Sequence, residues 1–332
     1  MNLTERYQEK LHQRYDDLEL SLDGVLLQLE VTNAYNHRCM FCPNSSSKRK
    51  RTMMDYDLAV RVMKECASFL GKDKRICFHM NGEPLLYPRL VELVQLAKSL
   101  DYDYIFLTTN GALADEVKLK ALLDAGLDSI KFSINAGTPE TYELIHGHND
   151  FERVLDGLHY VYKYRRQTGR DIKIFVSCVA VRQNQDELKH LQELAQPYCD
   201  EVVFYQPCGY AGQAMNISDM RCNLSELPVK SFEITHDIPC AVLWNSINVT
   251  CEGYLALCCS EADHRLIVED VNHASVQACW MGEKMTQIRR KHLHKNVEDT
   301  PCFSCVTNLP YNASSIDKHL FALALEKSAH GD

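Results

Sequence analysis

The sequence predicts an α/β fold built on a largely parallel sheet. Short apolar runs rich in Val, Ile and Phe alternate with amphipathic helical patterns, and the alternation repeats six times. The run Ile174-Phe175-Val176 has no polar alternation, so it suits a strand covered on both faces, as in parallel sheets with helical crossovers. Six repeats are too few for a closed eight-stranded barrel. An open doubly wound sheet and an incomplete barrel are both compatible with this pattern.

The repeating units occupy the first two thirds of the chain. Val25 to Val31 reads as the first strand, and Asp55 to Leu70 as a helix with its apolar residues along one face. The other strands are expected at Arg75–Met80, Tyr104–Thr109, Ser129–Ile134, Ile172–Val181 and Glu201–Tyr205. The other helices are expected at Pro88–Leu100, Asp115–Leu123, Phe151–Arg166 and Asp186–Leu194. In either sheet arrangement, ligands bind at the carboxyl ends of the strands.

The pattern changes after Pro207. Residues 207–239 show little periodicity and read as a bridging segment. Ser246–Thr250 and Tyr254–Cys258 then read as a hairpin around a Cys-Glu-Gly turn. Two further helices are expected, at Ser275–His292 and Ser314–Lys327. The sequence therefore predicts a large N-terminal part and a smaller C-terminal part, preceded by an extension at residues 1–24.

Composition narrows the class of protein. The chain has 332 residues, 45% of them hydrophobic, which is enough for a substantial core. Its formal charge of −9 and pI near 5.9 argue against nucleic acid or anionic lipid as a partner and favour a small molecule or peptide. No stretch approaches the roughly 18 consecutive apolar residues of a membrane span, and no signal peptide is visible, so a cytoplasmic location is expected. In such a compartment, 15 cysteines point to metal ligation rather than disulfides.

The most informative cysteines directly follow the first predicted strand. Cys39 and Cys42 are three residues apart on a predicted loop, so both thiolates can reach one iron-sulfur cluster or one zinc ion. Together with Tyr35 they form the string Tyr-x3-Cys-x2-Cys, with Phe41 before the last cysteine. This string resembles the Cys-x3-Cys-x2-Cys signature of the radical S-adenosylmethionine (SAM) enzymes in every position except the first ligand.

The resemblance implies a fold and a chemistry. The fold is a partial (β/α)6 TIM-type barrel, expected at residues 25–206. In this family three thiolates hold a [4Fe-4S] cluster, SAM chelates the open iron, and reductive cleavage yields a 5′-deoxyadenosyl radical that abstracts a substrate hydrogen. Tyr35, Cys39 and Cys42 then occupy the catalytic positions, with Cys39 and Cys42 as metal ligands. A flavodoxin- or ferredoxin-type protein is implied as electron donor.

Further segments at predicted strand ends resemble the SAM-binding parts of the family. Phe41 is expected near the adenine. A Gly-Glu-Pro segment follows the second strand, and its carboxylate and backbone carbonyls suit the SAM ammonium group. Each segment alone could be an ordinary turn, but they recur at successive strand ends. His79 is expected to line the same pocket, whereas His146 and His148 are expected to cap a loop. The complete set of expected cofactor-binding residues is Phe41, Gly82, Glu83, Pro84, Asn110, Ser133 and Asn135.

A second set of cysteines lies in the C-terminal part. The spacing Cys-x17-Cys-x43-Cys-x2-Cys resembles the twitch or SPASM extension, in which four cysteines ligate an auxiliary [4Fe-4S] cluster. A structural zinc site remains the alternative, because a hairpin plus a Cys-x2-Cys knuckle is also zinc-ribbon geometry. Cys259 competes with Cys258 for the second position, since adjacent strand residues point to opposite faces. The extension is expected at residues 240–310, before a helix and tail at 311–332, with Cys240, Cys258, Cys302 and Cys305 as ligands.

The side chain of Tyr35 determines whether the first cysteine site can bind a complete cluster. A phenol has a higher pKa than a thiol and offers a harder oxygen donor, so it matches cluster iron poorly. Two hypotheses follow: this chain is disabled or altered at the radical cluster, or the cluster assembles with a substitute ligand such as Tyr35 or His37.

Within this family, the expected reaction is oxidation or epimerisation of a small polar substrate such as a carbohydrate or aminocyclitol. Peptide-modifying members usually carry an extra domain ahead of the barrel, and residues 1–24 are too short for one. Cys208 and Cys222, in the bridging segment, are conceivable hydrogen donors to a substrate radical. Peptide modification and a non-catalytic iron-sulfur or zinc scaffold remain the alternatives.

Overall fold

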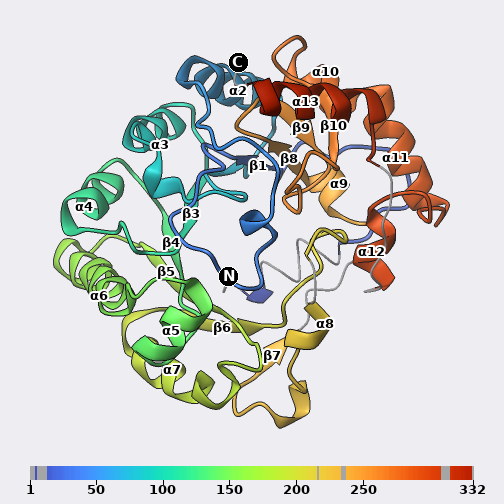
Figure 1. The fold of residues 1–332 in the computed structure, drawn as a ribbon. Coiled ribbons are helices and arrows are strands. Elements are labelled where there is room, and N and C mark those ends of the chain that lie inside the picture. Colours follow the sequence, from blue (N-terminus) through green and yellow to red (C-terminus); the bar gives the residue numbers. More distant parts are fainter. Residues whose placement is uncertain (1–3, 6–12, 215–216, 233–236, 308–314, 331–332) are drawn as a thin grey trace.

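The computed structural model describes residues 4–5, 13–214, 217–232, 237–307 and 315–330, and within them ten strands form one continuous sheet. The strand order is β10-β9-β8-β1-β2-β3-β4-β5-β6-β7. Strands β1 to β7 run parallel in chain order, and helices surround them on the outside (Figure 1). This is the expected partial TIM-type barrel. The parallel strands are β1 (Leu26–Leu29), β2 (Arg75–Cys77), β3 (Tyr104–Thr109), β4 (Ser129–Ser133), β5 (Lys173–Val179), β6 (Glu201–Tyr205) and β7 (Ser231–Phe232).

Alternate residues of each barrel strand face opposite sides of the sheet. In β3 the apolar side chains of Ile105 and Leu107 are fully buried, whereas Tyr104, Phe106 and Thr108 are only partly buried. Because parallel strands pair in register, Thr108 lies beside Lys131 of β4, and their strands reach the same edge of the sheet. The outer face therefore packs against helices, and the inner face ends in polar side chains at the carboxyl edge.

The barrel helices follow the predicted order, with one addition. They are α2 (Tyr56–Phe69), α3 (Leu90–Ser99), α4 (Glu116–Asp124), α5 (Pro139–His146), α6 (Phe151–Thr168) and α7 (Leu188–Ala195). Helix α5 was not predicted. Thr138 caps its first turn by accepting from the Thr141 N–H, Pro139 occupies the first turn, and Gly147 ends it in the left-handed region at φ 75°.

The C-terminal part extends the barrel sheet. Strand β8 (Ser246–Val249) pairs parallel with β1, and β9 (Tyr254–Ala256) returns antiparallel beside β8, which confirms the predicted hairpin. Strand β10 (Ile267–Asp270) completes this edge. The helix predicted over residues 275–292 is two helices, because the backbone is extended at Gly282. The remaining helices are α8 (Ile217–Met220), α9 (Val242–Asn245), α10 (Val276–Met281), α11 (Glu283–Leu293), α12 (Cys302–Thr307) and α13 (Lys318–His330).

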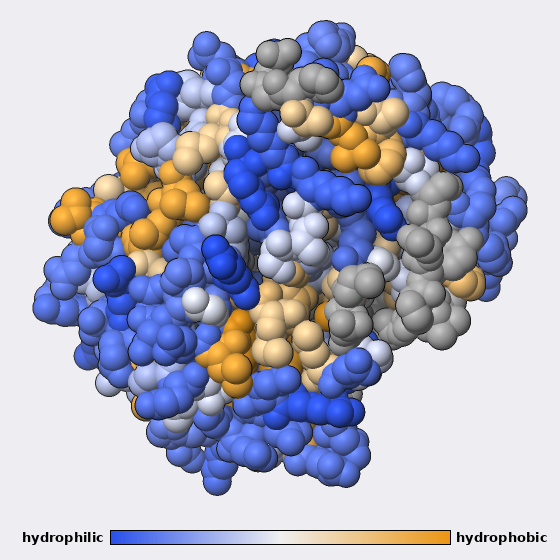
Figure 2. Space-filling model, in the orientation of Figure 1, coloured by the Kyte–Doolittle hydropathy of each residue, from blue (hydrophilic) through white to orange (hydrophobic). Residues whose placement is uncertain are grey.

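Some sequence predictions fall partly outside the described residues. These are most of the first 12 residues of the N-terminal extension, parts of the bridging segment, residues 308–310 at the end of the predicted extension, and residues 311–314 and 331–332 of the closing helix and tail. None of the helices in the described ranges is long and apolar enough to cross a membrane. Figure 2 shows a largely hydrophilic face, with apolar side chains gathered over α4 and near the middle of the molecule.

Candidate functional site

The loop that follows β1 carries the first cysteine motif and is held against the end of α5. The main-chain N–H of Arg38 donates to the carbonyl of His146 at 2.8 Å, and that of Met40 to the carbonyl of Ile145 at 3.0 Å. Within the loop, the N–H of Cys42 donates to the carbonyl of Cys39 at 3.0 Å and closes a turn. The two cysteines are thus fixed on one turn above the barrel.

This turn borders a cavity of about 160 Å³ at the carboxyl ends of the barrel strands. Tyr35, Cys39 and Cys42 line it. Six of the seven predicted cofactor-binding residues also line it, namely Phe41, Gly82, Glu83, Asn110, Ser133 and Asn135. Pro84 is buried outside the lining, where it begins a short 3-10 helix. Sequence segments up to about 100 residues apart therefore meet at one place, as predicted for strand ends of a parallel sheet.

A second cavity, of about 200 Å³, lies under the same loop. It shares Tyr35, Cys39 and Cys42 with the first cavity and adds Arg38, Arg51 and His37 among its walls. The motif residues therefore face both spaces. Two arginines beside the second space suit a group of negative charge, such as a thiolate-ligated cluster.

Gly82 and Glu83 join the cysteine loop to the barrel. A Cβ on Gly82 would lie 1.9 Å from the carbonyl oxygen of Thr32, so only glycine allows this approach. The carboxylate of Glu83 accepts from the Thr109 hydroxyl at 2.7 Å and from the Asn110 N–H at 2.8 Å. Burial raises the pKa of Glu83 to about 7, although these hydrogen bonds act in the opposite direction. Glu83 therefore ties the ends of β2 and β3 together at the cavity wall.

Tyr35 occupies the motif position at which the first cysteine ligand is expected. Burial raises the pKa of its phenol well above the usual value, and the neighbouring Cys39 and Cys42 thiols raise it further. Asn110 acts in the opposite direction and lowers the pKa of this phenol, but burial prevails. Tyr35 is thus a neutral hydrogen-bonding group, which is a poor replacement for a thiolate ligand.

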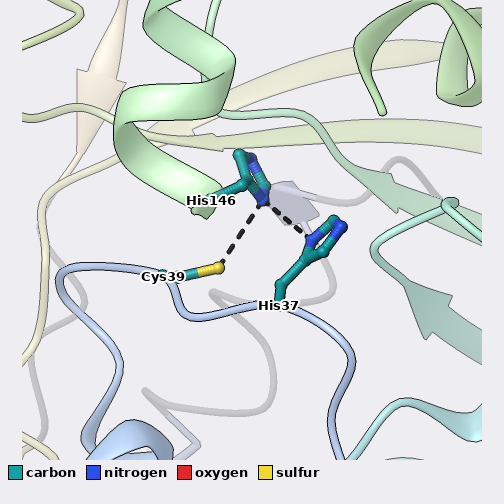
Figure 3. A group of neighbouring side chains, drawn as sticks. All are labelled: His37, Cys39 and His146. Carbon is teal, nitrogen blue, oxygen red and sulfur yellow. Dashed lines mark hydrogen bonds between the residues drawn. The ribbon is translucent and has the colours of Figure 1, made fainter. Parts of the chain in front are cut away.

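His37, Cys39 and His146 form a buried group beside the motif (Figure 3). The Cys39 sulfur lies 3.5 Å from Nδ1 of His146, which lies 3.3 Å from Nδ1 of His37. Nε2 of His37 lies 3.1 Å from the Asp150 carboxylate. Burial lowers the pKa of both imidazoles. Since both ring nitrogens of His37 have protein partners, His37 is not free to replace the missing cysteine.

The four C-terminal cysteines come from three different segments. Cys240 precedes α9, Cys258 follows β9, and Cys302 and Cys305 lie on α12. Burial raises the pKa of Cys258, Cys302 and Cys305, and each of them is raised further by repulsion from other members of this group. Cys258 interacts electrostatically with Cys240, Cys302 and Cys305. The four thiols, all in the described part of the chain, therefore lie in one region of the structure, although no three of their sulfur atoms lie within 4.8 Å of one another.

A buried ion-pair network joins the end of β1 to the C-terminal hairpin turn. Arg49 binds the carboxylate of Glu30 at the end of β1 with two nitrogens, and its Nε donates to Glu252 of the hairpin turn at 3.0 Å. Burial alone would lower the pKa of Arg49, but Glu30 and Glu252 raise it well above the usual value. The Arg49 side chain is 1% exposed, so this pair is held away from solvent.

Several cavity residues were not predicted as cluster-ligating or cofactor-binding residues. Tyr205, Pro207, Cys208 and Tyr210 line the cavity at the start of the bridging segment, as does His146, which was expected in a loop. Cys208 also interacts electrostatically with Cys42 of the first cysteine set and with Cys305 of the second. Of the two candidate hydrogen donors, Cys208 lines the cavity and Cys222 does not. His79 lines the cavity as expected.

Comparison with protein families agrees with this geometry. Residues 29–195 match the radical SAM superfamily, and residues 240–306 match a domain described as an iron-sulfur cluster-binding domain, SPASM. The second match favours an iron-sulfur cluster over zinc at the four C-terminal cysteines. Both matches cover the cysteine sets described above.

The curated relatives match only part of the chain. The chain is 34% identical to a GTP 3′,8-cyclase of Chlorobaculum tepidum over 133 residues, which is 40% of this chain and 39% of the relative. It is 30% identical to a probable GTP 3′,8-cyclase of Saccharolobus solfataricus over 170 residues, which is 51% of this chain and 52% of the relative. The match thus spans about half the length of these relatives or less.

Solved structures share the fold at low identity. BtrN in complex with AdoMet and 2-DOIA has a TM-score of 0.57 and 19% identity, covering 90% of this chain and 99% of that chain. SuiB of Streptococcus suis has a TM-score of 0.64 and 13% identity, covering 89% and 77%. The protein anSMEcpe with bound AdoMet has a TM-score of 0.60 and 15% identity, covering 91% of both chains.

Proposed function

The chain belongs to the radical SAM superfamily and carries a SPASM domain, and from this we propose that it abstracts hydrogen from a small polar substrate. The observation that carries the proposal is the cavity of about 160 Å³, where the motif cysteines meet the predicted SAM-binding residues. Both domains imply [4Fe-4S] clusters, and the first implies SAM. These groups supply an electron and a 5′-deoxyadenosyl radical when bound.

The chain offers four thiol ligands to the auxiliary cluster but only two to the radical cluster. The four thiols of Cys240, Cys258, Cys302 and Cys305 would hold the auxiliary cluster. Cys39 and Cys42 would hold the radical cluster at two corners, while Tyr35 offers only a neutral phenol at the third. We therefore propose that Tyr35 weakens the radical cluster and impairs SAM cleavage.

The cavity walls would orient SAM and substrate. The rim of Gly82 and Glu83 would receive the SAM amino group, and Phe41, which packs with the apolar side chains of Ile145 and Val179, would contact the adenine. Asn110, Ser133 and Asn135 would supply polar contacts. At His79, the Thr108 N–H donates to Nδ1 at 3.1 Å, so the hydrogen of the neutral ring is on Nε2.

The lining favours a substrate without multiple negative charges. Among the described residues that line this cavity, none is Lys or Arg, and the one carboxyl group is that of Glu83. A nucleoside triphosphate, the substrate class in the names of the curated relatives, would need cationic partners here. A carbohydrate or aminocyclitol needs hydroxyl, amide and imidazole groups, which the lining offers.

The position of Cys208 supports an oxidation. It lines the cavity and interacts electrostatically with Cys305 of the auxiliary site, so the substrate would lie near a second electron acceptor. Removal of one hydrogen atom leaves a substrate radical, and loss of one electron and one proton completes a two-electron oxidation. Epimerisation is the second candidate, because Cys208 also places a thiol hydrogen at the cavity. A flavodoxin- or ferredoxin-type donor and a cytoplasmic location complete the proposal.

The test compares the native chain with Tyr35→Cys after anaerobic reconstitution with iron and sulfide. In Tyr35→Cys we expect a cluster whose electron paramagnetic resonance (EPR) signal changes when SAM is added, and 5′-deoxyadenosine formation at least about 100-fold faster than in the native chain. Tyr35→Phe keeps the ring but has no ligand atom, and it should stay at the native rate.

Substrate class is tested in the same assay. Aminocyclitols and monosaccharides should accelerate 5′-deoxyadenosine formation in Tyr35→Cys and give an oxidised product, while GTP should not. Absence of 5′-deoxyadenosine despite a fully loaded cluster would contradict the enzymatic proposal. A response to GTP alone would replace the carbohydrate substrate by a nucleotide.

A further inference from the structure

His146 has a hydrogen-bonding pattern that defines its tautomer. The main-chain N–H of Asn135 donates to Nε2 of His146 at 3.3 Å. The side-chain amide of Asn135 also lies 3.2 Å from Nε2. Its other atom, Oδ1, accepts from the Val179 N–H at 2.7 Å, so the atom that faces His146 is the NH2 donor. Two donors point at Nε2, which therefore carries a lone pair, and the ring hydrogen is on Nδ1.

The Nδ1–H of His146 has two acceptors. The Cys39 sulfur lies 3.5 Å away and Nδ1 of His37 lies 3.3 Å away (Figure 3). Nε2 of His37 faces the Asp150 carboxylate at 3.1 Å, and a carboxylate only accepts. His37 therefore has its hydrogen on Nε2 and a lone pair on Nδ1. The chain of hydrogen bonds runs from Asn135 through His146 and His37 to Asp150.

From this geometry we infer that His146 is a positioning residue that donates its Nδ1 hydrogen to the sulfur of Cys39 when that sulfur ligates the radical cluster. His37 and Asp150 hold the His146 ring in place, and the ring stacks on Tyr142 with centroids 4.0 Å apart. The inference rests on the proposed function, because it takes Cys39 as a cluster ligand. It assigns to His146 a role that is separate from SAM or substrate binding.

The hydrogen bond has an electronic consequence. Reduction adds negative charge to the cluster and its sulfurs, and an N–H donor to a ligand sulfur stabilises that charge. His146 should therefore raise the reduction potential of the radical cluster.

A mononuclear metal site is the competing explanation. The ligand atoms of His37, Cys39 and His146 lie within 4.8 Å of one another, a spacing that a metal ion could accept. A histidine that binds metal through Nδ1 has its hydrogen on Nε2 and donates it to an acceptor. In this structure two donors face that position, so the group fits a hydrogen-bonded chain better than a metal site.

The first test labels the histidines with 15N. In the anaerobically purified protein, long-range nitrogen-proton NMR spectra report which ring nitrogen carries the hydrogen, and the His146→Asn variant assigns the signal. We expect His146 as the Nδ1–H tautomer. An Nε2–H tautomer overturns the inference, and this readout does not require a loaded cluster.

The second test uses the reconstituted Tyr35→Cys protein, in which three thiolates are available. His146→Phe keeps the stacking but removes the donor, and should shift cluster reduction about tenfold toward the oxidised form, about 59 mV for one electron. His146→Asn should restore the potential, because its amide nitrogen is two bonds from Cβ, as is Nδ1. Pulsed EPR should detect a weak 15N coupling that is lost in His146→Phe.

The outcomes separate the two proposals. A strong 15N coupling, typical of direct iron ligation, or an unchanged potential in His146→Phe overturns the role of His146. Failure of the proposed function appears differently, as a cluster whose spectrum does not respond to SAM in Tyr35→Cys.

Discussion

The auxiliary site has a cysteine at every ligand position, whereas the radical site lacks one cysteine but keeps the cavity around it. At the auxiliary site, all four expected ligand positions hold a cysteine, and these cysteines come from three segments. At the radical site, one of three ligand positions holds Tyr35, yet the cavity around it retains its glycine, carboxyl and amide groups. The comparison shows that one cluster ligand can be replaced while the surrounding scaffold is retained. The scaffold depends on hydrogen bonds such as those of Glu83, and not on the first cysteine.

The largest expected effect concerns the ligand set of the auxiliary site. Cys258→Ser should remove at least about half of the iron bound after reconstitution, because a four-thiolate cluster loses one ligand. Iron and sulfide per chain measure this. Cys259→Ser is the matched control and should keep its iron. If Cys259→Ser loses the iron and Cys258→Ser does not, the ligand assignment is reversed.

The next effect concerns Arg49, which joins the end of β1 to the hairpin turn. Arg49→Met leaves the carboxylates of Glu30 and Glu252 without their cation, and we expect it to lower the free energy of unfolding by about 3–5 kcal/mol. Chemical denaturation measures this. Arg89→Met breaks an exposed pair with Glu92 and should cause no measurable change. Equal stability of both variants would mean that the Arg49 network does not stabilise the fold.

A smaller effect concerns the packing of the cysteine loop on the barrel. Gly82→Ala would force its Cβ against the carbonyl of Thr32 and should cost about 1–3 kcal/mol of unfolding free energy. Gly209→Ala meets nothing within 4 Å and should be neutral. Denaturation of both variants tests whether the radical-site scaffold is packed as tightly as described. A neutral Gly82→Ala would show that the loop can move away.

The smallest effect is a difference between two buried carboxyl groups, those of Glu83 and Glu252, in how they make the free energy of unfolding depend on pH. Burial raises the pKa of Glu83 from 4.5 to about 7, so the folded state holds this proton more tightly and its stabilisation is lost as pH rises from about 4.5 to 7. At Glu252 burial opposes ionisation, but Arg49 prevails and lowers the pKa to about 2. Its stabilisation is present above about pH 4.5 and is lost as pH falls toward 2.

Unfolding measured across pH separates the two carboxyl groups. Glu83→Gln should reduce the loss of stability between about pH 4.5 and 7, whereas Glu252→Gln should reduce the loss on the acid side. Glu261 also has a pKa raised by burial to about 7, so part of the first slope should remain in Glu83→Gln. An unchanged slope in Glu83→Gln would contradict the assignment to Glu83.

Sequence patterns predicted the barrel elements well where the periodicity was long. The strands Tyr104–Thr109 and Glu201–Tyr205 have the predicted bounds. Helix α5 was missed although Thr138, Pro139 and Gly147 are helix start and stop signals, because its eight residues are too few for a clear amphipathic period. The single helix predicted over residues 275–292 was wrong, since extended backbone at Gly282 divides it.

By itself, the sequence determined the family, the fold class and the two cysteine sets, because these depend on local spacing and on periodicity along one segment. Only the tertiary structure decided that His146 touches Cys39, that Arg49 joins Glu30 to Glu252, and that Cys208 lines the cavity. These residues are up to about 200 positions apart. Their contacts depend on how helices and loops pack onto the sheet, which no local pattern encodes.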